Sequence, residues 1–247
     1  MKILILNPNM SIEMTNRMGD VASRVIAPDT EIVLATAQRG FPYISSRAEA
    51  QIAGAIVLEM IAEQISTIDA VVIAAYGDPG LRAARELFDL PVVGMAEAAM
   101  LTACMVGERF SLVTFTSHLV PWYLESVAAA GLQSRLASVR VPSETFRSVL
   151  EVRDELREFL VTEVSLAASE DRADAVILSG APLAGLAAEI CNPAAVLIDP
   201  ISAAVKQAEA LVRVCPGGAS TGSMKRPPAK TSIGLDSGLA RWINREN

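Results

Sequence analysis

Residues that could hold an anion or move a proton stand in four short segments, each directly after an apolar run. The segments are Asn7-Pro8-Asn9 with Ser11, Ala75-Tyr76-Gly77-Asp78, Thr114-Phe115-Thr116 and Ser179-Gly180-Ala181. Side-chain amides and closely approaching backbone N–H groups can bind a carboxylate or imide oxygen and can stabilise an enolate or oxyanion. We therefore predict a substrate pocket built from these segments.

Two of the four segments follow copies of one motif. Asp69-Ala-Val-Val-Ile-Ala-Ala-Tyr-Gly returns in altered form as Asp174-Ala-Val-Ile-Leu-Ser-Gly-Ala-Pro. Each copy has an acidic residue, an apolar run of strand length and then small residues that let the backbone turn. The sixth residue after the aspartate is Ala75 in one copy and Gly180 in the other, and neither has a side chain that can move a proton. Equivalent strands that end in equivalent loops predict two halves facing each other across a cleft.

Further candidates lie in the loop 39–46, which we expect to cover the cleft and which contains Tyr43 and Ser45. Asp78 belongs to a Gly-Asp-Pro-Gly turn, and its favoured interpretation is that it shapes this turn. The only histidine, His118, fits a surface position at a helix start better than a catalytic one. The residues that we expect to line the substrate site are Asn7, Asn9, Ser11, Tyr43, Ser45, Ala75, Gly77, Asp78, Thr114, Thr116, Gly180 and Ala181.

Short apolar runs alternate with stretches of helical periodicity along most of the chain. Strands are expected at 3–6, 31–37, 71–75, 91–95, 110–114, 137–141, 176–178 and 196–198. Helices are expected at 13–26, 49–66, 81–88, 97–105, 119–130, 150–170, 183–190 and 202–214. The strand–helix order occurs twice and predicts an α/β fold of two pseudo-symmetric, Rossmann-like lobes with parallel sheets. Ligands bind such sheets beyond the carboxyl ends of the strands, so the site should lie in the cleft between the lobes.

The predicted domains are a first lobe at 1–105, a second lobe at 106–215 and a C-terminal tail at 216–247. The sequence leaves open whether the last strand and helix of the first lobe pack against that lobe or cross over to the second. The tail is rich in proline and glycine and contains a short expected helix at 237–244. It can wrap either its own domain or a neighbouring subunit, and the sequence leaves both open.

Composition narrows the class of protein. A formal net charge of −7 and a pI near 4.9 disfavour binding to nucleic acid or anionic lipid. The apolar run at 3–6 is too short for a signal peptide, and no run reaches the roughly 18 apolar residues of a membrane span. We expect a cytoplasmic protein with a small-molecule substrate. One histidine and three widely spaced cysteines (Cys104, Cys191 and Cys215) favour neither a metal site nor a disulfide framework, and no cofactor is expected.

Several motifs together resemble the aspartate/glutamate/hydantoin racemase superfamily, most closely its hydantoin and allantoin racemase branch. The resemblance spans residues 2–214 and rests on Asn7-Pro-Asn-Met-Ser, Gly77-Asp-Pro-Gly-Leu, Pro91-Val-Val-Gly-Met-Ala-Glu-Ala-Ala-Met, Phe110-Ser-Leu-Val-Thr and Ile198-Asp with Ser202-Ala-Ala-Val. It implies two lobes with the site between them, and the family's frequent assemblies imply a homo-oligomer. It also implies catalysis by two cysteines, one on each face of the substrate.

The family's two cysteine positions correspond to Ala75 and Gly180, so both thiols are replaced here. Tyr76 directly follows the first of these positions and Ser179 directly precedes the second, so we predict that Tyr76 and Ser179 are the catalytic residues and that their hydroxyls transfer protons. Our first hypothesis is an enzyme that acts on a small carboxylate or cyclic ureide or imide through an enolate- or oxyanion-stabilising pocket. Without paired thiols, its reaction would be that of a lyase or decarboxylase, a hydrolase or an isomerase. The alternatives are a hydantoin-type racemase with other acid and base groups, and a non-catalytic small-molecule binding protein.

Overall fold

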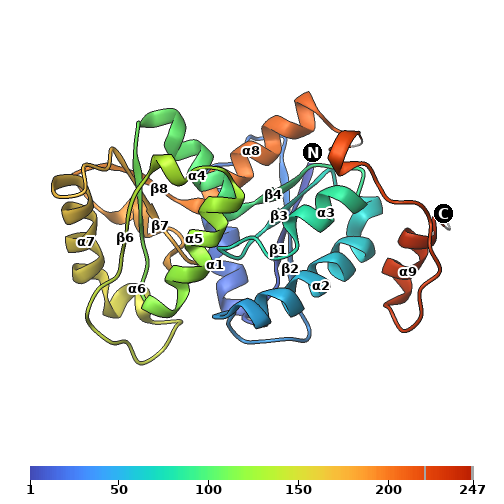
Figure 1. Ribbon diagram of the computed structural model, residues 1–247, viewed down its shortest axis with the longest axis horizontal. Helices are drawn as coiled ribbons and strands as arrows, with labels where there is room; N and C mark the ends of the chain where they lie inside the picture. Colours follow the sequence, from blue (N-terminus) through green and yellow to red (C-terminus); the bar gives the residue numbers. More distant parts are fainter. Residues whose placement is uncertain (220, 246–247) are drawn as a thin grey trace.

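The computed structural model describes residues 1–219 and 221–245, and two four-stranded parallel sheets lie side by side in it (Figure 1). The first sheet has the order β2-β1-β3-β4, with β1 at Lys2–Asn7, β2 at Glu31–Thr36, β3 at Ala70–Ile73 and β4 at Val92–Gly94. The second has the order β6-β5-β7-β8, with β5 at Phe110–Val113, β6 at Leu136–Arg140, β7 at Ala175–Leu178 and β8 at Val196–Ile198. Both sheets thus share one topology, which confirms the predicted fold class.

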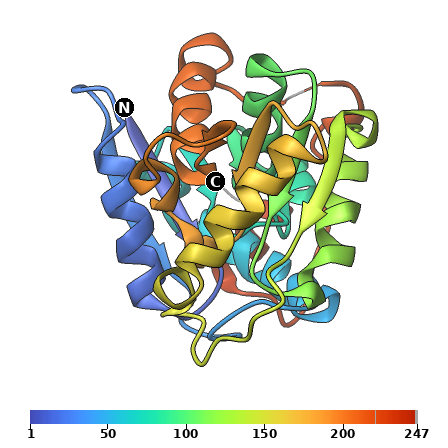
Figure 2. The ribbon, with the colours of Figure 1, turned by 90° about the vertical axis from the view of Figure 1, so that its left-hand side faces the viewer.

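Helices flank both sheets (Figures 1 and 2). They are α1 (Ile12–Ser23), α2 (Arg47–Gln64), α3 (Leu81–Leu87), α4 (Met95–Val106), α5 (Val120–Ala129), α6 (Val152–Glu155), α7 (Arg157–Ser169), α8 (Pro200–Val214) and α9 (Ser237–Asn244). Short 3-10 turns are η1 (Ile65–Thr67), η2 (Ser117–Leu119), η3 (Gln133–Arg135), η4 (Ala181–Leu183), η5 (Leu186–Glu189) and η6 (Gly222–Met224). Within the described residues, no helix combines the length and the apolar character that a membrane crossing requires.

The central strands explain the unbroken apolar runs in the sequence. All four residues of β3, of β5 and of β7 are buried, because helices cover both faces of each sheet. The edge strand β6 is only half-buried along its length. The strands that carry the candidate site segments are therefore held on both sides, and their carboxyl ends are fixed positions.

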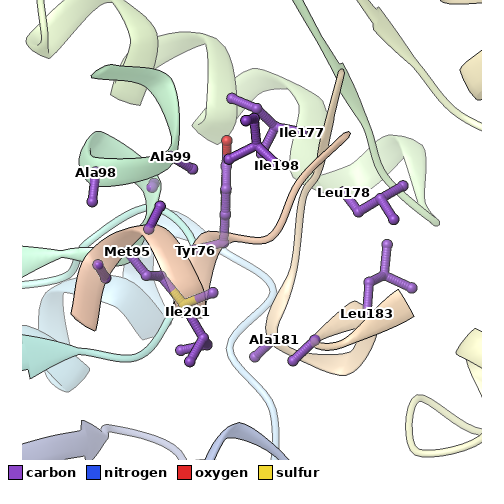
Figure 3. Packing of buried hydrophobic residues seen from close by; sticks show 14 of the residues in the cluster. Tyr76, Met95, Ala98, Ala99, Ile177, Leu178, Ala181, Leu183, Ile198 and Ile201 are labelled. Atoms are coloured by element: carbon purple, nitrogen blue, oxygen red, sulfur yellow. The ribbon is translucent and has the colours of Figure 1, made fainter. Parts of the chain in front are cut away.

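Two helices cross between the lobes. Helix α4, from the first half of the chain, packs against β5, β7 and β8 of the second sheet, while α8 packs against β1, β3 and β4 of the first. The Gln207 side chain on α8 donates hydrogen bonds to the Ala98 carbonyl (2.8 Å) and the Thr102 hydroxyl (3.0 Å) on α4. Buried residues of α4, α8 and β7, among them Met95 and Ile201, form one continuous core between the lobes (Figure 3).

The tail lies against the first lobe, where α9 packs on α2. The Trp242 indole N–H donates to the Leu87 carbonyl (2.8 Å), and the centre of its ring lies 5.7 Å from that of Phe88, with the two rings tilted by 34°. The Arg226 guanidinium lies 4.4 Å from the centre of the Trp242 ring. Within this chain the tail therefore packs against its own first lobe.

Two predicted helices are wrong. The single helix expected at 150–170 is broken at Leu156 (φ −103°, ψ 11°) into α6 and α7. The periodicity hides this break, because Val152, Leu156 and Leu160 are all buried. The helix expected at 183–190 is replaced by η4 and η5, because Gly185 between them has φ +83°, which stops helical continuation.

Candidate active site

A small cavity lies where the carboxyl ends of β3 and β7 face each other. We call it the interlobe cavity; it is lined by Asn9, Tyr43, Ile44, Ala75, Tyr76, Trp122, Tyr123, Gly180 and Ala181. Its volume is about 20 Å³, which is room for about one water molecule. The two positions where the family resemblance places thiols thus line the same cavity. The structure also brings Asn9, Tyr43, Tyr76 and Ala181 together there, as the sequence predicted.

A larger hollow adjoins it. This outer hollow has a volume of about 680 Å³ and is lined by Tyr43, Ser45, Ser46, Arg47, Ala48, Thr116, His118, Trp122 and Phe146. It takes in the predicted site residues Ser45 and Thr116. Tyr43 and Trp122 line both spaces and therefore form the partition between them.

A third space lies on another side of the first loop. It is a side groove of about 700 Å³ between α2, α3 and α5, and Gly77 and Asp78 line it rather than the interlobe cavity. Gly77 packs under an indole, since a Cβ atom on it would lie 2.4 Å from Trp122 Cζ2. The three cysteines belong to none of these linings, and two of them, Cys191 and Cys215, are exposed.

The segment after β1 is organised by its own hydrogen bonds. Asn7 is fully buried, and its amide nitrogen donates to Asn9 Oδ1 (3.0 Å) and Thr15 Oγ1 (2.9 Å). Ser11 caps α1, because its hydroxyl accepts from the Met14 N–H (3.2 Å). Asn7 and Ser11 do not line the cavity; they position Asn9. Within the described residues, the Asn9 amide nitrogen has only a long contact to the Met14 sulfur (3.7 Å), so it retains donor capacity.

Asp78 fastens the loop after β3 to α4. Its carboxylate accepts from the backbone N–H groups of Ala96 (2.9 Å) and Glu97 (2.8 Å) in the first turn of the helix. Burial raises the pKa of Asp78 to about 7, while the same two N–H bonds act to lower it. A Cβ atom on Gly94 would lie 2.3 Å from the Asp78 carboxyl carbon, so glycine is what lets the carboxylate approach. These contacts agree with a turn-shaping role.

The second half achieves the same fastening with a different residue. Asp199 caps α8 by accepting from the Ser202 N–H (2.8 Å), and it also accepts from the Gly185 N–H (2.7 Å). Gly185 and Gly80 both adopt left-handed backbone conformations in the loops after β7 and β3. The loop geometry is therefore repeated, although the carboxylate comes from the loop in one half and from the helix start in the other.

The two predicted catalytic hydroxyls lie at different depths. Ser179 is fully buried, donates to the Ile177 carbonyl (3.2 Å) and does not line the interlobe cavity. Tyr76 does line it, but Figure 3 draws its hydroxyl near Ile177 and Ile198, within the core between the lobes. Burial raises the pKa of Tyr76, against a smaller opposing effect of the nearby Ser179 hydroxyl. The catalytic roles of Ser179 and Tyr76 stay predictions.

Tyrosine hydroxyls dominate the polar chemistry of the cavity wall. Burial raises the pKa of Tyr43 and of Tyr123, so that both rings stay neutral near pH 7. Among the described residues, the hydroxyls of Tyr43 and Tyr76 form no geometrically acceptable hydrogen bond, and neither does that of Thr114, at the end of β5. Neutral phenols can donate a hydrogen bond to a carbonyl or enolate oxygen, but they cannot serve as bases at this pH.

Backbone donors complete the wall. No hydrogen bond to another described residue uses the backbone N–H groups of Tyr76, Gly77, Gly180 or Ala181. Gly180 has φ +129°, and a Cβ atom on it would lie 2.8 Å from Phe115 Cε1. The second loop therefore presents bare backbone to the cavity, and it does so in a conformation that glycine favours.

Sequence reasoning missed three residues of the cavity wall. Ile44 lies in the loop that was expected to cover the cleft, directly after Tyr43. Trp122 and Tyr123 lie at the start of α5, soon after the Thr114–Thr116 segment. An aromatic pair so close to the end of a central strand is the signal that could have identified them.

The chain is similar to known proteins over most of its length. The family described as Asp/Glu/Hydantoin racemase matches residues 3–208. A hydantoin racemase from Paenarthrobacter aurescens is 34% identical over 233 residues, which is 93% of this chain and 99% of the relative. The structure of an allantoin racemase from Klebsiella pneumoniae superposes with a TM-score of 0.88 at 33% identity, covering 96% of this chain and 98% of that one. An allantoin racemase structure from Pseudomonas fluorescens gives a TM-score of 0.85 at 32% identity, covering 95% and 100%.

Proposed function

This chain belongs to the Asp/Glu/hydantoin racemase family, and from that premise we propose an enzyme that stabilises an enolate or oxyanion without paired thiols. Its substrate is a small carboxylate or a cyclic ureide or imide, bound at the interlobe cavity. The proposal includes no cofactor. The favoured reaction is a lyase reaction of the decarboxylase type, since that reaction needs no base from the protein.

One observation carries this proposal. The nine residues that line the interlobe cavity include no cysteine, carboxylate, histidine or lysine. What the wall offers instead is phenol hydroxyls, the Asn9 amide and free backbone N–H groups. All of these donate hydrogen bonds, and preorganised donors of this kind typically supply on the order of 3 kcal/mol each to an oxyanion. The wall is thus suited to stabilising negative charge and poorly suited to abstracting a proton.

Decarboxylation of a malonate-type acid fits such a wall. The bond between the α-carbon and one carboxyl carbon breaks, and its electron pair moves into the remaining carboxyl group to form an enediolate while CO₂ leaves. Donors from the Gly180–Ala181 segment and from Asn9 stabilise the developing charge. The phenol of Tyr43, or a water molecule, then returns one proton to the carbon. Because burial raises the pKa of this phenol, the tyrosinate so formed readily takes up a proton again.

A second candidate is racemisation of a hydantoin-like ring. The 34% identity to a hydantoin racemase favours it. The cavity also has phenols from both halves of the chain, Tyr43 and Tyr76 from the first and Tyr123 from the second. A tyrosine pair would have to replace the family's two thiols, and the raised pKa of each ring makes it a weak source of base near neutrality.

Incubation in D₂O, followed by NMR, separates these possibilities. The substrates are an aryl- or alkyl-substituted malonate, a single enantiomer of a 5-substituted hydantoin, and allantoin. Loss of CO₂ with one deuterium on the product's α-carbon supports the lyase proposal. Deuterium at the α-carbon of intact hydantoin identifies a racemase, and ring opening identifies a hydrolase. Complete inertness, combined with a thermal shift by the same compounds, would instead identify a binding protein.

A further inference from the structure

The interlobe cavity is too small for any substrate of the proposed function, so a ligand needs a way in. At about 20 Å³ it holds about one water molecule, whereas the outer hollow beside it has about 680 Å³. Among the residues that the structure describes, only Tyr43 and Trp122 line both spaces. If these two side chains swung aside, the cavity and the hollow would become one continuous site.

We propose that Tyr43 and Trp122 form an aromatic gate between the outer hollow and the interlobe cavity, and that the Arg47–Glu125 ion pair latches it. The gate admits a small planar carbonyl compound, which is the ligand class of the proposed function. The gate can be tested in the protein without any substrate, because opening changes the exposure of Trp122 whether or not a reaction follows.

The gate residues come from different halves of the chain. Tyr43 lies in the loop 39–46 that precedes α2, and Trp122 lies at the start of α5. Trp122 packs against the small cluster that contains Ile44 and Ala75, and it lies over Gly77, where a Cβ atom would meet its ring at 2.4 Å. The indole therefore rests on the loop after β3 and closes the cavity by filling the space beside Ala75.

The latch ties these two elements together. Arg47, the first residue of α2, is four residues after Tyr43, and Glu125 is three residues after Trp122 on α5. The Arg47 Nε atom lies 2.8 and 2.9 Å from the two carboxylate oxygens of Glu125, and its Nη2 atom also bonds to Glu125, so the contact is bidentate. Both side chains are more than half exposed, at 60% and 55%. A pair so exposed is weak enough to break and reform.

A second contact between the halves lies on another side of the site. Arg17 on α1 donates to the Pro182 carbonyl (2.9 Å), beside Gly180 and Ala181, and to the Leu150 carbonyl (3.2 Å). Its acceptors are backbone atoms, so the loop after β7 is tied to α1 without a charged partner. Of these two contacts beside the site, the exposed ion pair is the one that added salt or loss of one charge would release, so opening should occur at the Arg47–Glu125 side.

Acrylamide quenching of Trp122 fluorescence tests the gate directly. The chain has two tryptophans, and Trp242→Phe leaves Trp122 as the only one. In that background, Glu125→Gln removes the charge of the latch while keeping its shape. Glu31→Gln is the matched control, because the Lys2–Glu31 pair is similarly exposed (50% and 61%) but lies at the edge of the first sheet.

We expect Glu125→Gln to raise the quenching constant of Trp122 roughly two- to five-fold, the range that loss of one surface ion pair gives. Glu31→Gln should leave the constant unchanged, and the charge-swapped Arg47→Glu/Glu125→Arg protein should return it toward the parent value. Tyr43→Ala should raise it with the latch intact. If circular dichroism shows that the Glu125→Gln protein and its parent are both folded and their quenching constants are equal, the latch is overturned. If Tyr43→Ala leaves the quenching constant of Trp122 unchanged, the gate is overturned. Neither result depends on whether a substrate is turned over.

Discussion

Replacing Gly180 with cysteine would return a thiol to a position where the family resemblance places one, and we expect this change to destabilise the protein. The backbone at Gly180 has φ +129°, which costs a non-glycine residue about 1–3 kcal/mol. The new Cβ atom would also lie 2.8 Å from Phe115 Cε1, and displacing a packed ring costs about 1–3 kcal/mol more. The free energy of unfolding should therefore fall by about 2–6 kcal/mol.

Urea denaturation under reducing conditions measures this cost. With a slope of about 3 kcal/mol per molar, the midpoint should fall by roughly 0.7–2 M. Gly131→Cys is the matched control, because Gly131 also has positive φ (+73°) but no neighbouring atom within 4 Å of the position of an added Cβ atom. This variant should therefore lose only about 1–2 kcal/mol of stability, from backbone strain alone. Phe115→Leu should recover part of the loss in the Gly180→Cys protein. If Gly180→Cys unfolded at the same midpoint as Gly131→Cys, the argument from the Phe115 contact would be refuted.

Two further changes test the framework of the site. Burial raises the pKa of Asp78 from its ordinary value of 3.8 to about 7, so its contribution to stability is fully present below about pH 4 and is lost as the pH rises to 7. Asp78→Asn should therefore flatten the pH dependence of the melting temperature between about pH 4 and 7, and parallel profiles for the two proteins would contradict this. Trp242→Ala removes the tail's hydrogen bond to the Leu87 carbonyl and its ring contact, so it should cost about 3 kcal/mol and expose the tail to limited proteolysis. A tail as resistant as the parent's would show that other contacts hold it.

The fold is largely predictable because its signals are local. Central strands buried on both faces appear as short apolar runs, and the repeat of the Asp69 motif at Asp174 is enough to indicate two matched halves. The two wrongly predicted helices lie where the spacing of apolar residues indicates a helix but the backbone does not continue as one. Leu156 keeps the apolar spacing of a helix while its backbone breaks the helix, and Gly185 interrupts a run whose composition is typical of a helix.

The site is predictable at the strand ends and less so elsewhere. Topology dictates that the loops of Ala75 and Gly180 meet, so these positions can be found from the repeat. A polar residue at a strand end can either face the cavity or hold the neighbouring loop and helix in place. Its hydrogen-bond partners decide between these roles, and the sequence does not specify those partners. Asn7 and Ser11 are predicted to bind substrate, yet their bonds position Asn9 and α1. Trp122 reaches the cavity from the start of α5, so only its place as part of an aromatic pair soon after the end of β5 could have indicated it.

The exchange of helices between the lobes bears on how the molecule comes off the ribosome. The faces of β1 and β3 that α8 covers are complete once the first half has been translated, but α8 itself is made near residue 214. Until then the nascent first sheet exposes an apolar surface, which is the condition under which chains aggregate or recruit chaperones. Splitting this gene at its midpoint should therefore yield two fragments that stay insoluble apart and become soluble only when co-expressed.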